Sequence, residues 1–255
     1  MSVLITGASS GIGLELAKVF AHHGYDLIIA ARSKEKMDIL KSELETKYNI
    51  KVDVCKVDLA QEDGASFLYD EVKALGVEVE ILVNNAGVGY VGEFVKAGYE
   101  KDLSMMELNM TNLTLLTKYF SREMMKNGRG KILNVASTGS YHPGPYTAIY
   151  YATKAYVLSL SEALWLELKP YNITVSALCP GATKTNFAKV AGKADPRMAM
   201  SPEFMAKAAY KGLMKGKRVI VPGFRNKLFV KLPRWLVIGM IGRYQASLAS
   251  KANER

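Results

Sequence analysis

Ser2-Val3-Leu4-Ile5-Thr6-Gly7-Ala8-Ser9-Ser10-Gly11-Ile12-Gly13 is the stretch that decides the fold. Its first five residues have the apolar pattern of a buried strand, and a glycine-rich turn and a helical pattern follow at once. Such a turn lets the backbone approach a pyrophosphate, which the N-terminus of the helix then stabilises. A glycine triplet alone is weak evidence, but its place between a strand and a helix predicts a dinucleotide-binding unit.

Strands and helices alternate along most of the remaining chain. Further strand patterns cover residues 26–31, 52–57, 80–83, 131–136, 173–178 and 218–221, and helical patterns cover residues 34–48, 61–75, 103–127 and 150–169. This alternation indicates crossover connections and a parallel sheet with helices on both faces. We therefore expect an α/β fold, a Rossmann-type doubly wound sheet of about seven strands. Residues 1–223 would form this single domain, and residues 224–255 a basic, amphipathic C-terminal extension.

Polar residues follow the second, third and fourth strand patterns, and ligands gather at the carboxyl ends of the strands in such sheets. Arg32 and Ser33 follow the second strand. An acidic residue near this point would bind a ribose 2′-hydroxyl, whereas an arginine favours a 2′-phosphate. Because residues 30–33 contain no Asp or Glu, we predict NADP(H) rather than NAD(H). The alternative is that Arg32 is a solvated residue at the end of a strand.

The run from residue 131 to residue 154 carries a second constellation. Ser137 follows a strand pattern, and a helical pattern then places Tyr150 and Lys154 four residues apart, on one face of a helix. A nearby ammonium group lowers the pKa of a tyrosine and makes it a better acid or base. These groups suit the reduction of a carbonyl, with the hydride supplied by a cofactor. Spacing alone leaves Tyr146 and Tyr151 as rival phenols, and a simple surface pair as another interpretation.

Together these motifs resemble the short-chain dehydrogenase/reductase family, in its compact single-domain branch. The matching residues run in order from residue 2 to about residue 222: Thr6 to Gly13, Asn84-Asn85-Ala86-Gly87, Asn109, Ser137, Tyr150-Tyr151-Ala152-Thr153-Lys154 and Pro180-Gly181. The resemblance implies that Tyr150 is the general acid and base, that Ser137 positions the substrate oxygen, and that Lys154 lowers the pKa of Tyr150 and holds the nicotinamide ribose. Asn109 would anchor a water that relays protons to Lys154.

The family also implies a set of cofactor contacts. Asp58 would reach the adenine, Asn85 would lie near a ribose, and Thr185 would hold the nicotinamide amide. The expected cofactor-binding residues are Gly7, Ser9, Ser10, Gly11, Ile12, Gly13, Arg32, Ser33, Asp58, Leu59, Asn85, Ala86, Gly87, Tyr150, Lys154, Pro180, Gly181, Thr183 and Thr185. Members of the family pair two helices across a subunit interface, so we expect a homodimer or homotetramer.

The composition limits the other classes of function. The chain of 255 residues is 49% hydrophobic, begins almost at once on a strand, and has no apolar run near the roughly 20 residues of a membrane span. Cys55 and Cys179 have no CxxC spacing, so we expect buried thiols and no metal site. We predict a soluble, cytoplasmic protein that does not bind nucleic acid, since no nucleic-acid motif accompanies its net charge of +10.

The basic residues are concentrated at the C-terminal end. Residues 201–255 hold 12 Lys and Arg against 2 Asp and Glu, while residues 1–200 hold 22 of each kind. Leu236, Met240, Tyr244 and Leu248 share one predicted helical face with Val237 and Ile241. This extension would pack on its own domain or on a partner subunit, lie on an anionic membrane, or dock an acidic carrier protein.

Together, these features predict an NADP(H)-dependent oxidoreductase that acts on a hydrophobic ketone or aldehyde, or on the alcohol in the reverse direction. Residues 188–201 have the composition of a substrate lid, and candidate walls are Phe187, Met198, Met200, Tyr146 and Tyr141. Two alternatives are a reductase of 3-oxoacyl groups on a carrier protein and a non-catalytic NADP(H)-binding module. The presence of Asn109, Ser137, Tyr150 and Lys154 argues against the second, because a binding role needs no proton donor.

Overall fold

The computed structural model describes residues 1–187, 191 and 199–253, and a seven-stranded parallel sheet forms its centre. The strands are β1 (Ser2–Thr6), β2 (Asp26–Ala31), β3 (Val52–Lys56), β4 (Val79–Asn84), β5 (Gly130–Val135), β6 (Ile173–Leu178) and β7 (Val219–Ile220). Their order is β3-β2-β1-β4-β5-β6-β7. The order reverses between β1 and β4, where doubly wound sheets bind ligands. The predicted Rossmann-type fold is confirmed.

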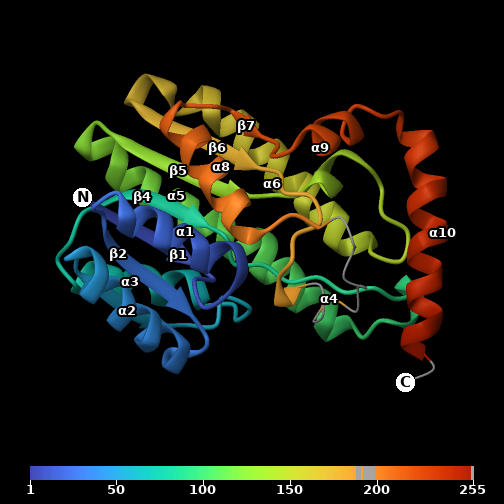
Figure 1. Cartoon of the computed structure of the whole chain (residues 1–255), viewed down its shortest axis with the longest axis horizontal. Coiled ribbons are helices and arrows are strands. Elements are labelled where there is room, and N and C mark those ends of the chain that lie inside the picture. Colours follow the sequence, from blue (N-terminus) through green and yellow to red (C-terminus); the bar gives the residue numbers. More distant parts are fainter. Residues whose placement is uncertain (188–190, 192–198, 254–255) are drawn as a thin grey trace.

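Helices cover both faces of this sheet (Figure 1). On one face Phe20 and Leu213 share an apolar core with the strands, and on the other Leu68 and Phe120 do so. The first layer consists of α1 (Gly11–His22), α2 (Lys34–Tyr48) and α8 (Pro202–Met214), and the second of α3 (Gly64–Ala74), α5 (Asn112–Asn127) and α6 (Ala148–Glu167). Short 3₁₀ turns are η1 (Phe94–Lys96), η3 (Thr138–Tyr141) and η4 (Lys169–Tyr171). Because both faces are covered, the strands are almost continuously apolar.

The structure differs from the single helix predicted over residues 103–127. The helical run begins earlier, with α4 (Tyr99–Met106), and a π-helical turn, η2 (Glu107–Thr111), separates α4 from α5. A π-helical turn accommodates one extra residue in the helix and often lies at a functional site. Asn109 lies in η2 and is fully buried, so this turn aims the side chain of Asn109 into the interior.

Helix α3 also begins three residues later than predicted, at Gly64 rather than Gln61. The side chain of Asn112 explains this difference. Its amide nitrogen donates hydrogen bonds to the carbonyl oxygens of Leu59 and Gln61, and its amide oxygen accepts one from the backbone N–H of Ala65. These contacts hold residues 59–61 as a turn and satisfy an N–H group in the first turn of α3.

Beyond β7 the chain forms α9 (Phe224–Phe229) and α10 (Arg234–Asn253), and α10 stands at the opposite end of the molecule from α2 (Figure 1). The predicted helical face is rotated by about one residue. Val237, Ile241, Gln245 and Leu248 are buried, whereas Leu236, Met240 and Tyr244 are exposed. None of the helices in the described ranges combines the length and apolar character that a membrane crossing needs.

Candidate active site

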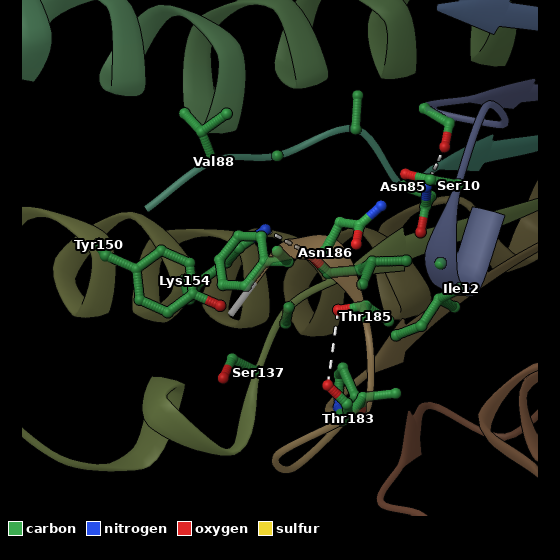
Figure 2. Close-up of a pocket in the computed structure, with 18 of the residues that line it drawn as sticks. Ser10, Ile12, Asn85, Val88, Ser137, Tyr150, Lys154, Thr183, Thr185 and Asn186 are labelled. Atoms are coloured by element: carbon green, nitrogen blue, oxygen red, sulfur yellow. Dashed lines mark hydrogen bonds between the residues drawn. The ribbon is translucent and has the colours of Figure 1, made fainter. Parts of the chain in front are cut away.

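A cavity of ≈ 980 Å³ lies at the carboxyl ends of the strands. Figure 2 shows part of its wall, in which residues from distant parts of the chain face one space. The predicted site residues that line it are Gly7, Ser9, Ser10, Gly11, Ile12, Arg32, Ser33, Asp58, Leu59, Asn85, Ala86, Gly87, Ser137, Tyr150, Lys154, Pro180, Gly181, Thr183 and Thr185. Two predicted residues, Gly13 and Asn109, are not part of the lining, and each lies directly behind it.

The glycine-rich turn between β1 and α1 has no room for side chains at its three glycines. Gly7 and Gly11 have positive φ angles of 68° and 58°, a region that favours glycine. A β-carbon on Gly13 would lie 2.4 Å from the carbonyl oxygen of Gly7. Gly13 therefore contributes close packing of the helix against the turn rather than a wall of the cavity. Since Ser10 at the N-cap makes no side-chain capping bond, the first N–H groups of α1 are left for another acceptor.

Asn85 holds this turn in place from the neighbouring strand. Its amide nitrogen donates to the carbonyl oxygens of Thr6 (2.9 Å) and Gly7 (3.2 Å), and its backbone N–H donates to the hydroxyl of Thr6. The side chain of Asn85 thus joins the ends of β1 and β4. Asp58 is also locally bonded, because its carboxylate accepts from the backbone N–H of Ala60.

A basic corner closes the cavity near the end of β2. Arg32 and Ser33 line it as predicted, and Lys36 on α2 joins them. Within the described ranges, Arg32 makes no ion pair, whereas its neighbour Lys34 pairs with Asp38. Lys36 was missed in the sequence, although its position four residues after Arg32, in the first turn of a predicted helix, was a usable signal. The corner therefore presents two cations and a hydroxyl.

Ser137 and Tyr150 meet at the opposite end of the cavity. The side chain of Ser137 caps η3 by accepting from the backbone N–H of Gly139 (3.0 Å), so its position is fixed directly after β5. Figure 2 shows the hydroxyl groups of Ser137 and Tyr150 facing the same part of the cavity. Burial raises the pKa of Tyr150 to about 12, although a hydrogen bond with Ser137 acts in the opposite direction. The phenol is therefore protonated at neutral pH.

Lys154 lies one turn further along α6 and is only 3% exposed. Its ammonium group donates a hydrogen bond of 2.8 Å to the carbonyl oxygen of Val135, at the end of β5. Burial lowers the pKa of Lys154 to about 8. The expected lowering of the Tyr150 pKa by Lys154 is not present in this structure. The physical reason is that desolvation of the phenol outweighs its stabilising contacts, and that the lysine is bonded to the backbone of β5.

Asn109 lies behind this pair and supports the segment after β4. Its side chain accepts from the backbone N–H of Val88 and donates both to the carbonyl oxygen of Val88 and to the hydroxyl of Thr153. A β-carbon on Gly87 would lie 3.2 Å from Asn109 Oδ1 and 3.2 Å from Lys154 Nζ. Glycine at this position thus leaves a small space between the two side chains.

The predicted substrate walls are confirmed only in part. Phe187 lines the cavity, and its ring centroid lies 5.5 Å from that of Tyr150. Tyr141, Tyr146 and Met200 do not belong to the lining. Met200 pairs with Thr183 in an isolated β-bridge, and its side chain lies beside Gly223. Met198 and most of the predicted lid over residues 188–201 lie outside the described residues.

Several lining residues were not among the predicted catalytic and cofactor-binding residues. They are Lys36, Val88, Leu108, Tyr151, Asn186, Asn226, Phe229, Ile241, Tyr244 and Gln245. The last five lie on α9 and α10, and the C-terminal extension therefore contributes to the cavity lining. The helical period of α10 was visible in the sequence, but the side of the domain on which it packs was not.

The donor set and shape fit a dinucleotide cofactor. The free N–H groups of α1 and the glycines around them suit a pyrophosphate, the basic corner suits a further phosphate, and Ser137, Tyr150 and Lys154 lie at the other end, where a nicotinamide would meet a substrate.

Known proteins resemble the chain over most of its length. The family profile described as short chain dehydrogenase matches residues 1–196. Human very-long-chain 3-oxoacyl-CoA reductase is 29% identical over 247 residues, which cover 93% of this chain and 77% of that protein. A short-chain dehydrogenase from Sphingobium yanoikuyae, solved in complex with NADPH, is 32% identical with a TM-score of 0.83, over 91% of this chain and 96% of that one. A bulky-bulky ketone specific alcohol dehydrogenase from Comamonas testosteroni is 33% identical with a TM-score of 0.80, over 91% and 95% of the two chains.

Proposed function

The chain belongs to the short-chain dehydrogenase/reductase family and is an NAD(P)-dependent oxidoreductase; from this premise we propose that it transfers a hydride between NADPH and a hydrophobic ketone or aldehyde, or back from the secondary alcohol. The observation that carries the proposal is the meeting of Ser137, Tyr150 and Lys154 in the same cavity as the glycine-rich turn. A cavity that only binds a dinucleotide needs no buried phenol beside a hydroxyl group.

NADP(H) is the proposed cofactor because of the basic corner. A 2′-phosphate there would receive charge-assisted hydrogen bonds from Arg32 and Lys36 and a further bond from Ser33. Ser9 also lines the cavity. An NAD(H)-specific corner would instead offer a carboxylate to the ribose hydroxyl. The NADPH bound to the Sphingobium relative supports this preference.

The remaining cofactor contacts follow the order of the strands. Gly7, Ser10, Gly11 and Ile12 would hold the pyrophosphate, Asp58 and Leu59 the adenine, and Asn85, Ala86 and Gly87 the central riboses. Pro180, Gly181, Thr183 and Thr185 follow β6 and would hold the nicotinamide amide. When bound, the cofactor supplies the hydride that no side chain can supply.

Tyr150 would deliver the proton to the substrate oxygen. Its pKa of about 12 keeps the phenol protonated, which is the form that a reduction requires. Ser137 would hold the same oxygen through its hydroxyl and orient the carbonyl toward the nicotinamide. In the direction of oxidation Tyr150 must lose its proton, which its raised pKa disfavours in this structure.

Lys154 and Asn109 complete the proposed proton path. Lys154 would hold the nicotinamide ribose and return protons toward Tyr150. Asn109 would anchor a water next to Lys154, in the small space that a side chain on Gly87 would fill. The π-helical turn supports this role, because such turns often lie at functional sites.

The substrate is proposed to be largely apolar. Val88, Phe187, Phe229 and Ile241 give the cavity lining an apolar component. The name of the Comamonas relative indicates bulky ketones. The name of the human relative indicates 3-oxoacyl-CoA, and a 3-oxoacyl group, here delivered on an acidic carrier protein, is the second candidate. Strong salt dependence with carrier-bound but not free substrates would favour that candidate.

We also propose a homo-oligomer, with α5 and α6 at the subunit interface. Met125, Tyr156 and Leu166 are exposed apolar or aromatic side chains on these helices. Light scattering of the purified protein gives the oligomeric state. We place the protein in the cytoplasm, which is consistent with its two free, buried cysteines.

The C-terminal extension, residues 224–255, is proposed as an addition to the catalytic unit of residues 1–223 that also touches an anionic membrane surface. Phe224 (81%) and Trp235 (77%) are among its most exposed side chains, with Leu228 and Ile238 nearby in the sequence. Arg225, Lys227, Lys231 and Arg234 lie near them in the sequence, and this combination suits the interface of an anionic membrane.

A panel of ketones and aldehydes tests the function directly. NADPH oxidation is followed by absorbance with alkyl, aryl and 3-oxoacyl substrates, and the reverse reaction with the alcohols. We expect turnover with bulky apolar ketones, and slower turnover with NADH. Absence of turnover with every carbonyl and alcohol, despite tight NADPH binding, would contradict the proposal.

A further inference from the structure

Among residues 234–250 of α10, whose burial the structure describes, one buried side chain is polar. Val237, Ile241 and Leu248 are apolar, and between them lies Gln245, which is 3% exposed. Ile241, Tyr244 and Gln245 all line the cavity that holds Tyr150. A glutamine is seldom fully buried without partners, so its place in this wall calls for a physical explanation.

One end of the Gln245 amide is bonded to the catalytic helix. The amide donates a hydrogen bond to the hydroxyl oxygen of Tyr151, which lowers the pKa of that phenol against the larger opposite effect of burial. Tyr151 directly follows Tyr150 on α6. Helix α10 also lies close to the loop that precedes α6, since a β-carbon on Gly242 would be 3.5 Å from Cγ of Pro145 in that loop. The hydrogen bond to Tyr151 therefore holds the amide of Gln245 against α6.

The other end of the amide has no partner. Gln245 Oε1 is buried and accepts no hydrogen bond from any residue that the structure describes. A buried acceptor without a donor costs free energy, and such atoms often mark a place that a ligand or a water completes. Because the hydrogen bond to Tyr151 occupies the nitrogen end, the available end is an acceptor.

Two other buried side-chain atoms in the described part of the chain also have no partner, and they differ from Gln245. Asn84 Oδ1 belongs to an internal network in which the amide nitrogen donates to Thr117 and Asn134. His142 Nδ1 lies on a ring whose Nε2 contacts the carbonyl oxygen of Phe229. Neither residue lines the cavity. Gln245 thus combines an unpaired buried acceptor with a place in the cavity lining.

We propose that Gln245 accepts a hydrogen bond from a hydroxyl or amide N–H group of the substrate, located away from the reacting carbonyl, so that α10 is part of the substrate site. This inference rests on the proposed function, because the carbonyl is placed by Ser137 and Tyr150. The substrate class is then an apolar ketone or aldehyde with a hydrogen-bond donor at its far end. A donor there completes the amide, whereas an apolar end leaves Oε1 unpaired.

Paired ketones test the inference. Ketones carrying a para-hydroxyphenyl group on alkyl chains of increasing length are compared with the para-methoxyphenyl and unsubstituted phenyl ketones. At the chain length that reaches Gln245, kcat/KM for the hydroxyl compound should exceed that of both partners by about tenfold, the value of one good hydrogen bond. Gln245→Met keeps the volume but removes the amide, and the ratio should fall to about one. A wild-type ratio near one at every chain length, or a ratio that survives in Gln245→Met, would overturn the inference.

Two further measurements separate the possible failures. Leu248→Ala, on the same buried face but outside the cavity lining, should keep the ratio, because it loosens α10 without touching the amide; loss of the ratio in this variant would assign the effect to helix packing and overturn the inference. Calorimetric Kd values for the same ketones, measured with NADPH and with wild type or Gln245→Met, do not require turnover. If no ketone is reduced, the proposed function fails, and the calorimetric preference for the hydroxyl compound still decides the role of Gln245.

Discussion

Lys154 and Val135 are joined by a hydrogen bond of 2.8 Å, in which the buried ammonium group donates to the carbonyl oxygen at the end of β5. This bond ties α6 to the strand that precedes Ser137. It therefore sets the distance between the serine and Tyr150, one helical turn before the lysine. The same burial that makes the bond strong also disfavours the positive charge of Lys154.

The stability of the protein should depend on the ionisation of Lys154. Its pKa is lowered from 10.5 to about 8 in the folded state, so the unfolded state binds the proton more tightly between these values. Burial of the charged ammonium group therefore destabilises the folded state below pH 8. This penalty is relieved between pH 8 and pH 10.5, so the free energy of unfolding rises over that range and stays constant above it. The full change is on the order of 3 kcal/mol, from about 1.4 kcal/mol per pKa unit.

Denaturant unfolding of wild type and Lys154→Met at several pH values measures this contribution. The difference in free energy between the two proteins should be constant below pH 8 and then increase in favour of wild type. The comparison removes the opposing contributions of Cys179 and Tyr150, whose burial raises their pKa values. A difference that stays flat up to pH 10.5 would show that Lys154 is not desolvated.

The cofactor preference should change when the basic corner is reversed. Arg32→Asp replaces a cation that lines the cavity with a group suited to a ribose hydroxyl, and we expect the ratio of kcat/KM for NADPH over NADH to fall by about tenfold or more. Lys34→Asp is the matched control, because Lys34 is two residues away, pairs with Asp38 and does not line the cavity. If both variants change the ratio equally, the effect comes from the overall change in charge and not from a contact between Arg32 and the 2′-phosphate.

The glycine-rich turn should not tolerate a methyl group at Gly13. In Gly13→Ala the new β-carbon would lie 2.4 Å from the Gly7 carbonyl oxygen and 2.4 Å from Asn85 Nδ2. The turn must shift, so we expect a lower Tm and weaker NADPH binding. Gly239→Ala on α10, where nothing lies within 4 Å, should keep the Tm or raise it. Alanine favours a helix over glycine by up to about 1 kcal/mol. Normal NADPH affinity in Gly13→Ala would remove the turn from the cofactor site.

The extension should bind anionic vesicles. At low salt, we expect the wild-type protein to sediment with phosphatidylglycerol vesicles and not with phosphatidylcholine vesicles. Leu228→Ser combined with Trp235→Ser should weaken this binding. Ile39→Ser is the control, since Ile39 is exposed on α2 at the opposite end of the molecule. Equal sedimentation of all three proteins would reject the membrane contact.

The sheet could be predicted from the sequence because parallel strands buried on both faces are continuous apolar runs between helical patterns. The π-helical turn could not, since one inserted residue hardly changes an apolar stripe such as that from Leu103 to Met124. Its effect is nonlocal: Asn109 is buried only because Val88 and Thr153 offer it partners.

The site likewise has features that the sequence predicts and features that depend on tertiary contacts. Ser137, Tyr150 and Lys154 were recognisable from spacing and resemblance, and they do line one cavity. The state of Tyr150 was not predictable, because a pKa depends on burial, and the number of residues between a phenol and an ammonium group does not give that. The role of Gln245 was hidden for a related reason, as a helical period shows which residues share a face but not which face is buried.

The most direct test of the central claim is the turnover of Tyr150→Phe with NADPH and a bulky ketone. This substitution removes the phenolic oxygen and keeps the ring that packs against Phe187. We predict that kcat falls by a factor of about 10² to 10⁴, the usual contribution of a general acid, while the Kd for NADPH is nearly unchanged. Tyr146→Phe, outside the cavity lining, should keep normal turnover. Near-normal turnover of Tyr150→Phe would contradict the account.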